Sequence, residues 1–155
     1  MSSAIRWVVR AFNDLSVSQL YQVLQLRSTV FVVEQQCAFL DADGQDQRAL
    51  TVMGFDAADA LVATARIFSP EVSIYPGYAC IGRVCSAQSV RRGGVGRQLM
   101  EQSIQQCQSH FGRVPIKIGA QLYLQRFYES FGFVAQGDVY DEDGIPHICM
   151  IRAVE

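Results

Sequence analysis

A glycine-rich junction near the middle of the chain constrains the fold most. The apolar run 78–86 is typical of a strand, the segment 94–110 has the spacing of an amphipathic helix, and the turn 91–96 joins them. Its three glycines leave backbone N–H groups accessible at the positive end of a helix, and its two arginines add positive charge. The junction predicts an anion-binding turn, with a plain tight turn as the alternative. The residues expected to form the site are Arg91, Arg92, Gly93, Gly94, Val95 and Gly96.

Two better-known phosphate motifs do not fit this turn. The Walker pattern requires Lys and then Ser or Thr after its last glycine, where this chain has Arg97 and Gln98. The dinucleotide fingerprint requires a further small residue where Leu99 stands. The sequence therefore favours neither a nucleoside triphosphate nor NAD.

Hydrophobic periodicity predicts the remaining elements. A helix capped by Asp14 or Ser16 is expected to reach Val30 or beyond, and the polar segment 34–48 is expected to form an ordered loop. The resulting order, β-α-β-β-β-α-β-α-β-β, implies an α/β (α+β) fold with a mixed sheet and helices on both faces. The other strands are expected at 5–11, 50–55, 61–68, 114–118, 134–140 and 145–151, and the last helix at 122–130.

Bulk properties bound the class of protein. A chain of 155 residues that is 50% hydrophobic is sized for one domain, 1–155. Its net charge of −2 gives no general attraction to nucleic acid or to an anionic membrane. Five cysteines without C-x-x-C spacing are expected to be reduced thiols and not metal ligands. With no run near the ~20 apolar residues of a membrane span, we expect a cytoplasmic protein.

Several motifs resemble one enzyme superfamily. R-R-G-G-V-G resembles the R/Q-x-x-G-x-G/A signature of the GNAT acetyl-CoA-dependent N-acyltransferases, and Q-L-Y-L-Q-R-F-Y-E-S-F-G-F from Gln121 resembles their later Tyr-x-x-x-Gly-Phe motif. The chain also resembles the ElaA-like branch, through L-Y-Q-V-L-Q-L-R-S-T-V-F-V-V-E-Q from Leu20, D-A-D-G from Asp41, I-G-R-V from Ile81 and E-D-G-I-P-H-I from Glu142. The likeness spans nearly the whole length.

The resemblance implies where acetyl-CoA binds. In this superfamily the sheet splays open beside its central strand, and the pantetheine arm pairs with that strand, here through the backbone of Val84, Cys85 and Ser86. The pyrophosphate is then expected on the glycine-rich turn. Gln121 stands where many relatives have an Asn that binds the pantetheine, so it keeps the amide but changes its reach.

The resemblance also implies catalytic roles. Tyr128 matches the family's general acid, with an ordinary core aromatic as the alternative. A backbone N–H at Val84 or Cys85 is the expected oxyanion donor. Glu34 and His147 are the two candidates for the base; the alternatives are a solvated charge at a helix end and a strand histidine bonded to backbone.

Other functions remain open at this stage. Cys85 as an acyl-accepting nucleophile with His147 as its base is a second mechanism, and a catalytically silent acyl-CoA-binding or sensing module is a second function. Asp41 and Asp43 hint at a cation or a cationic substrate, although D-A-D-G lacks the closing Glu of a calcium loop, so no metal is expected. The expected acceptor is a small-molecule or peptide amine, which attacks acetyl-CoA directly in a ternary complex and receives its acetyl group. The sequence also allows a homodimer.

Overall fold

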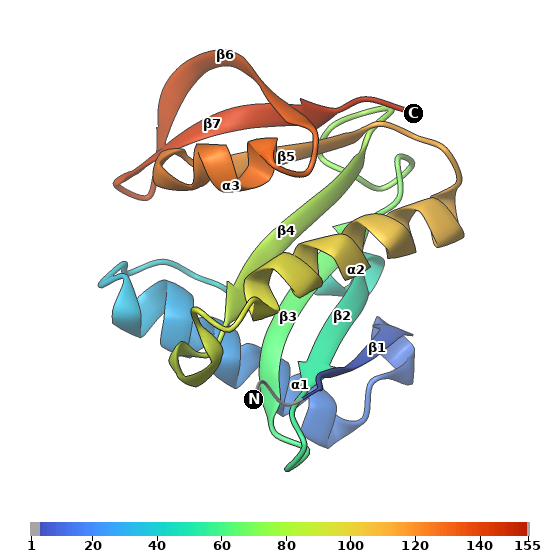
Figure 1. The fold of residues 1–155 in the computed structure, drawn as a ribbon, viewed down its shortest axis with the longest axis vertical. Coiled ribbons are helices and arrows are strands. Elements are labelled where there is room, and N and C mark those ends of the chain that lie inside the picture. Colours follow the sequence, from blue (N-terminus) through green and yellow to red (C-terminus); the bar gives the residue numbers. More distant parts are fainter. Residues whose placement is uncertain (1–3, 155) are drawn as a thin grey trace.

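The computed structural model describes residues 4–154, and its centre is one seven-stranded sheet with the order β1-β2-β3-β4-β5-β7-β6 (Figure 1). Neighbouring strands are antiparallel except β4 and β5, which are parallel. The predicted mixed, mostly antiparallel sheet is therefore confirmed. The strands are β1 (Arg6–Ala11), β2 (Leu50–Phe55), β3 (Leu61–Phe68), β4 (Ala79–Ser86), β5 (Ile116–Gln121), β6 (Phe133–Glu142) and β7 (Ile145–Arg152).

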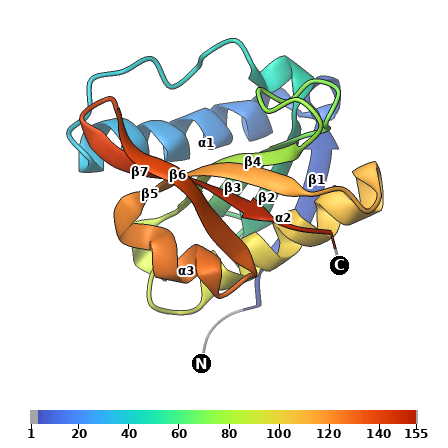
Figure 2. The ribbon, with the colours of Figure 1, turned by 90° about the horizontal axis from the view of Figure 1, so that it is seen from above.

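Helices cover both faces of the sheet, as predicted. Helix α1 (Val17–Arg27) lies on one face, and α2 (Val95–Phe111) and α3 (Gln125–Glu129) lie on the other (Figure 2). The apolar side of α2 packs against the central strands, which gives the largest buried cluster of the protein. None of the helices within residues 4–154 is long and apolar enough to span a membrane.

The first helix changes type before it ends. Ser16 caps α1 through a complete capping box with Gln19. The predicted extension beyond Val30 is present, but it is a π-helix over Ser28–Glu34, in which the Gln35 N–H donates to the Val30 carbonyl at 3.3 Å. π-helical turns are rare and occur often at functional sites. This turn carries Glu34 and places Gln35 at its C-terminal end.

The predicted strand at 114–118 is wrong at both ends, because β5 begins at Ile116 and runs to Gln121. The prediction stopped the strand before Gly119. A side chain at that glycine would meet the Tyr140 hydroxyl, which lies 2.6 Å from the ideal Cβ position, so a larger residue there would force the Tyr140 side chain to shift. The extension places Gln121 at the end of β5. The segment 122–130 is helical as expected, but it begins with a 3-10 turn at Leu122–Leu124.

Candidate active site

A cavity of about 710 Å³ opens where β4 and β5 diverge. The two strands pair only at Ala79 with Ile116 and Cys80 with Lys117, although β4 runs on to Ser86 and β5 to Gln121. The unpaired part of β4 therefore offers backbone donors and acceptors to the cavity. All three residues predicted there line it, namely Val84, Cys85 and Ser86.

A β-bulge shapes the mouth of this split. Thr64 of β3 pairs with Cys85 of β4, and Arg66 pairs with Gly82, so two steps along β3 match three along β4. Arg83 is the additional residue, and its φ of 49° is in the left-handed region. A bulge bends its strand and re-aims a side chain. Here it lies directly before the backbone expected to hold the thioester.

The predicted anion-binding turn has the required backbone geometry. Gly94 is the N-cap of α2 with a φ of 83°, and no side chain caps the helix there. The first helical N–H groups consequently lack intrahelical partners, and bonding begins with the Gln98 N–H to the Gly94 carbonyl at 3.1 Å. Of the predicted residues, Arg91 and Gly96 line the cavity itself. Arg92, Gly93 and Gly94 are exposed beyond that lining, and the Val95 side chain is buried in the core, so only its backbone can face a ligand.

Tyr128 is a core aromatic residue that also lines the cavity. Its ring packs edge-on against Phe127 and Phe133, with centroid distances of 5.2 and 6.1 Å, and only 7% of the residue is exposed. Burial raises the pKa of its hydroxyl to about 12, so the group carries its proton at neutral pH, as a general acid requires.

His147, on β7, is buried and also lines the cavity. Its Nδ1 lies 2.7 Å from the Ile145 carbonyl, and its Nε2 lies 3.1 Å from a carboxylate oxygen of Glu142. Both ring nitrogens are therefore already engaged by groups of this chain. An amine that approached the ring would have to compete with the Glu142 carboxylate or with the Ile145 carbonyl.

Glu34 lines the cavity but is already paired. Its carboxylate lies 2.6 Å from Nη2 of Arg91, whose side chain also donates to the Ser86 carbonyl at 2.9 Å. Arg91 thus occupies a backbone acceptor that the resemblance assigns to pantetheine. Binding of the cofactor there requires Arg91 to leave the carbonyl.

Gln121 reaches across the cavity to Gln35. The two amides exchange hydrogen bonds of 3.4 and 3.3 Å, which joins the end of β5 to the end of the π-helix. Both residues line the cavity. The predicted contact of Gln121 with pantetheine would compete with this pair.

The arrangement disfavours the covalent mechanism through Cys85. The thiol is buried against Leu26 and Val30, and burial raises its pKa to about 12, so it is not a thiolate at neutral pH. Within the described chain, His147 contacts Glu142, Ile145 and the Tyr140 ring, and not Cys85. All five cysteines are free thiols.

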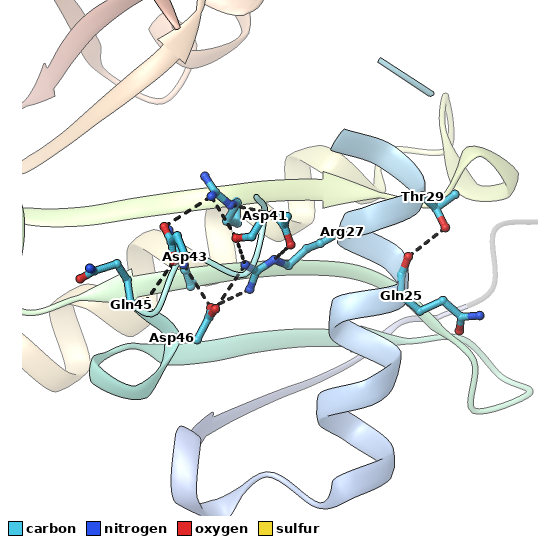
Figure 3. Close-up of polar contacts among 9 residues, drawn as sticks. Gln25, Arg27, Thr29, Asp41, Asp43, Gln45 and Asp46 are labelled. Atoms are coloured by element: carbon cyan, nitrogen blue, oxygen red, sulfur yellow. Dashed lines mark hydrogen bonds and ion pairs between the residues drawn. The ribbon is translucent and has the colours of Figure 1, made fainter. Parts of the chain in front are cut away.

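A closed ring of six alternating charges lies beside the cavity (Figure 3). Each of three arginines contacts two aspartates, and each aspartate contacts two arginines. The ion pairs in order are Arg27–Asp41 (2.9 Å), Asp41–Arg83 (2.9 Å), Arg83–Asp43 (3.4 Å), Asp43–Arg66 (2.7 Å), Arg66–Asp46 (3.2 Å) and Asp46–Arg27 (2.6 Å). We call this set the Arg-Asp ring. It has three charges of each sign.

The ring corrects the predicted role of Asp41 and Asp43. Both carboxylates form ion pairs with arginines of this chain, so they do not form a free site for a cationic substrate. The hydrogen bond from Arg66 holds the pKa of Asp43 well below its usual range. Burial alone would raise the pKa of Asp46, but hydrogen bonding and charge from Arg27 lower it. No group of three or more His, Cys, Asp and Glu side chains in residues 4–154 is placed to hold a metal ion.

Sequence reasoning missed the ring and with it the cavity residues Arg83 and Gln35. A signal was present, because Arg66 and Arg83 interrupt apolar strands and Arg27 lies on the buried side of α1. A buried arginine needs carboxylate partners. The nearby polar segment with Asp41, Asp43 and Asp46 offers three.

The chain belongs to the GNAT acetyltransferase family. The family model described as an acetyltransferase (GNAT) domain matches residues 42–154, and the sheet split beside β4 agrees with it. The resemblance drawn from the motifs is thereby confirmed, and so is the fold class.

The similarity extends over nearly the full length of individual relatives. The chain is 45% identical to protein ElaA of Escherichia coli K12 over 152 residues, which covers 97% of each chain. The crystal structure of Escherichia coli ElaA superposes with a TM-score of 0.88 at 44% identity, covering 96% of this chain and 99% of that one. A Pseudomonas aeruginosa acyl-CoA N-acyltransferase gives a TM-score of 0.91 at 39% identity, covering 97% and 100%.

Proposed function

We propose that the protein transfers an acetyl group from acetyl-CoA to a primary amine by direct attack in a ternary complex. The observation that carries the proposal is that one cavity joins the open edge of β4, the uncapped N-terminus of α2 and the hydroxyl-bearing ring of Tyr128. The helix N-terminus suits the pyrophosphate, and the β4 backbone suits the pantetheine amides. Membership of an acyltransferase family supports the same reaction.

The residues divide the chemistry as follows. The amine nitrogen bonds to the acyl carbon, and a backbone N–H at Val84 or Cys85 stabilises the oxygen that gains charge. The carbon–sulfur bond then breaks, and Tyr128 gives its proton to the departing thiolate. The amine proton leaves through Glu34 or His147. For His147 the exit runs through Glu142, whose side chain is 57% exposed to solvent.

The decisive test is release of free thiol from acetyl-CoA with a panel of amines. We expect turnover by the parental protein and a decrease of about a hundredfold or more in kcat for Tyr128→Phe, with acetyl-CoA affinity retained, because only the hydroxyl is lost. Parental rates in Tyr128→Phe, where chemistry limits turnover, would remove Tyr128 from the mechanism. Tight acetyl-CoA binding without thiol release for any amine would favour the sensing module instead.

Two further variants separate the candidate bases. Loss of the essential base lowers kcat/KM most at low pH, where the amine is most protonated. We expect one of Glu34→Gln and His147→Gln to show this pH dependence and the other to leave it unchanged. Replacement of all five cysteines by Ser or Ala is expected to retain activity, and its loss with an intact fold would revive the covalent route.

A further inference from the structure

Arg83 is the one member of the Arg-Asp ring that lines the cavity. Its side chain is 23% exposed, against 3% for Arg27 and 9% for Arg66. The bulge in β4 is the reason, because the additional residue re-aims its side chain relative to a regular strand. The ring therefore presents a single guanidinium to whatever enters from this side.

Ion pairs hold this guanidinium in place, but not all of its N–H groups make hydrogen bonds. Its Nε and Nη2 face Asp41 and Asp43, and the Phe39 ring lies 5.4 Å from its central carbon. The hydrogen bonds that Arg83 makes within residues 4–154 come from Nη2, to the Asp41 carbonyl at 3.1 Å and to the Asp43 carboxylate at 3.4 Å, and none comes from Nη1. Even Nε, which lies at ion-pair distance from Asp41, makes no well-aligned hydrogen bond. Burial lowers the pKa of Arg83, which is the direction expected for a cation that lacks solvation.

Two other titratable side chains of the cavity lining also have side-chain partners. Glu34 is paired with Arg91, and His147 is paired with Glu142. Neither Asp41 nor Asp43 lines the cavity. Because Arg91 is paired with Glu34, which lines the same cavity, and the partners of Arg83 lie outside the lining, an anionic group on a substrate would find a complementary charge on the cavity-facing edge of Arg83, where a guanidinium binds a carboxylate well.

The position of Arg83 limits how far this anionic group lies from the reacting amine. A strand rises about 3.3 Å per residue, so the Arg83 backbone is within about 7 Å of the Cys85 backbone. The Val84 and Cys85 backbone is the expected site of the thioester carbonyl. The guanidinium lies further out along its side chain, so this spacing is compatible with an acceptor that carries its carboxylate a few bonds from the attacking nitrogen.

We infer that the acceptor is a free amino acid or a similarly compact amine, and that Arg83 binds its carboxylate. The inference rests on the proposed N-acyltransferase activity and names its substrate class. In the reaction the amine nitrogen bonds to the acetyl carbon, the carbon–sulfur bond breaks, and the amine proton balances the thiolate. The carboxylate is unchanged and serves only to orient the amine.

Matched substrates test this assignment directly. Thiol release is measured with the twenty standard amino acids, with their carboxamides and with the amines left by decarboxylation. We expect the accepted amino acid to have a KM at least tenfold lower than its amide or its decarboxylated amine. Arg83→Gln should erase this preference, so that the amino acid and its amide have the same KM, and Arg83→Lys should retain part of it. Arg10→Gln, an exposed arginine on β1, serves as the control.

Binding of N-acetyl amino acids and of their amides, measured by calorimetry, distinguishes this inference from the proposed function. If the parental protein binds the acids at least tenfold more tightly but acetylates no amine, Arg83 keeps its role and the enzyme proposal fails. Amides equal to acids in turnover and binding would overturn the inference, as would an Arg83→Gln protein that keeps the preference. Circular dichroism checks each fold; if Arg83→Gln unfolds, the parental protein and Arg83→Lys decide.

Discussion

The two sides of the cavity are built in opposite ways. One side, which we call the turn side, consists of the end of β4, residues 91–96 and the start of α2, and it offers mainly backbone groups from one continuous segment. The other, the ring side, is a set of charged side chains from α1, β3, β4 and the segment 41–46. Because the turn side binds through its backbone, we expect changes there to affect ligand binding with little effect on stability. Because the ring side is buried, we expect changes there to destabilise the fold.

Arg27→Ala should give the largest effect and test the stability of the ring side. The side chain is 3% exposed and contacts both Asp41 and Asp46, so its loss leaves buried carboxylates with too few partners. We expect the free energy of unfolding to fall by about 3–5 kcal/mol. Urea denaturation measures it.

The control is Arg6→Ala, which removes an ion pair whose side chains are 59% and 81% exposed and should cost at most about 1 kcal/mol. Equal losses in the two variants would break the comparison, because the ring would then contribute no more than a surface pair.

Gly96→Ala tests the turn side without backbone strain. Gly96 lies inside α2, and a Cβ there would meet no atom within 4 Å, so alanine should leave stability unchanged or raise it by about 0.5–1 kcal/mol. We expect acetyl-CoA affinity to fall about tenfold, or about 1.4 kcal/mol, because the methyl group blocks close approach of the pyrophosphate. Calorimetry measures the affinity.

Gln108→Ala, at an exposed position near the other end of α2, is the matched control and should alter neither property much. Undiminished affinity in Gly96→Ala would show that the cofactor does not approach this turn.

Acid should reduce the contribution of the ring side to the free energy of unfolding before it affects the turn side. The folded pKa of Asp43 lies below its unfolded value of about 3.9, so its stabilising contribution is complete from about pH 5 upwards and is lost progressively as pH falls through the unfolded pKa towards the folded one. Compared with Asp43→Asn, the parental protein should be more stable by about 1 kcal/mol at pH 7, and the difference should narrow at pH 3. Urea denaturation at the two pH values measures it. A difference that stays constant would show that Asp43 does not depend on its charge.

The same contrast explains what could be predicted from sequence. The order of strands and helices along the chain, both main helices and the turn side follow from local patterns, because periodicity and glycine spacing act within a few residues. The Arg-Asp ring depends on contacts between segments up to 42 positions apart, such as Arg83 with Asp41, and no local pattern specifies them. The predicted strand ends before Gly119, because the sequence does not show that this glycine packs under the Tyr140 hydroxyl of β6.

The candidate catalytic residues could be predicted in part: motifs indicate which residues belong to the site, but not which of them pair with one another. Tyr128 and the Val84–Ser86 backbone were placed in the cavity by motif resemblance, and the structure brings them together there. The pairing of Glu34 with Arg91 was not expected, since it joins the π-helix to the turn after β4. A pair formed between distant segments is visible only once the sheet has brought them together.

The smallest expected effect concerns Arg91, which lies on the turn side and pairs with Glu34 at the end of the π-helix. The side chain is 39% exposed and is bonded to Glu34 and to the Ser86 carbonyl, so its gain from a phosphate is offset by the contacts it gives up. We expect Arg91→Ala to weaken CoA binding about threefold at low salt and less at high salt, because exposed charges are screened.

Acetyl-pantetheine, which has no pyrophosphate, separates the two contributions of Arg91. Arg91→Ala should bind it at least as well as the parental protein, because the variant leaves the Ser86 carbonyl open to the ligand. Calorimetry with both ligands at two salt concentrations measures this. A larger loss for acetyl-pantetheine than for CoA would mean that Arg91 supports the β4 backbone rather than the phosphates, and the turn side would then depend on side chains as much as the ring side does.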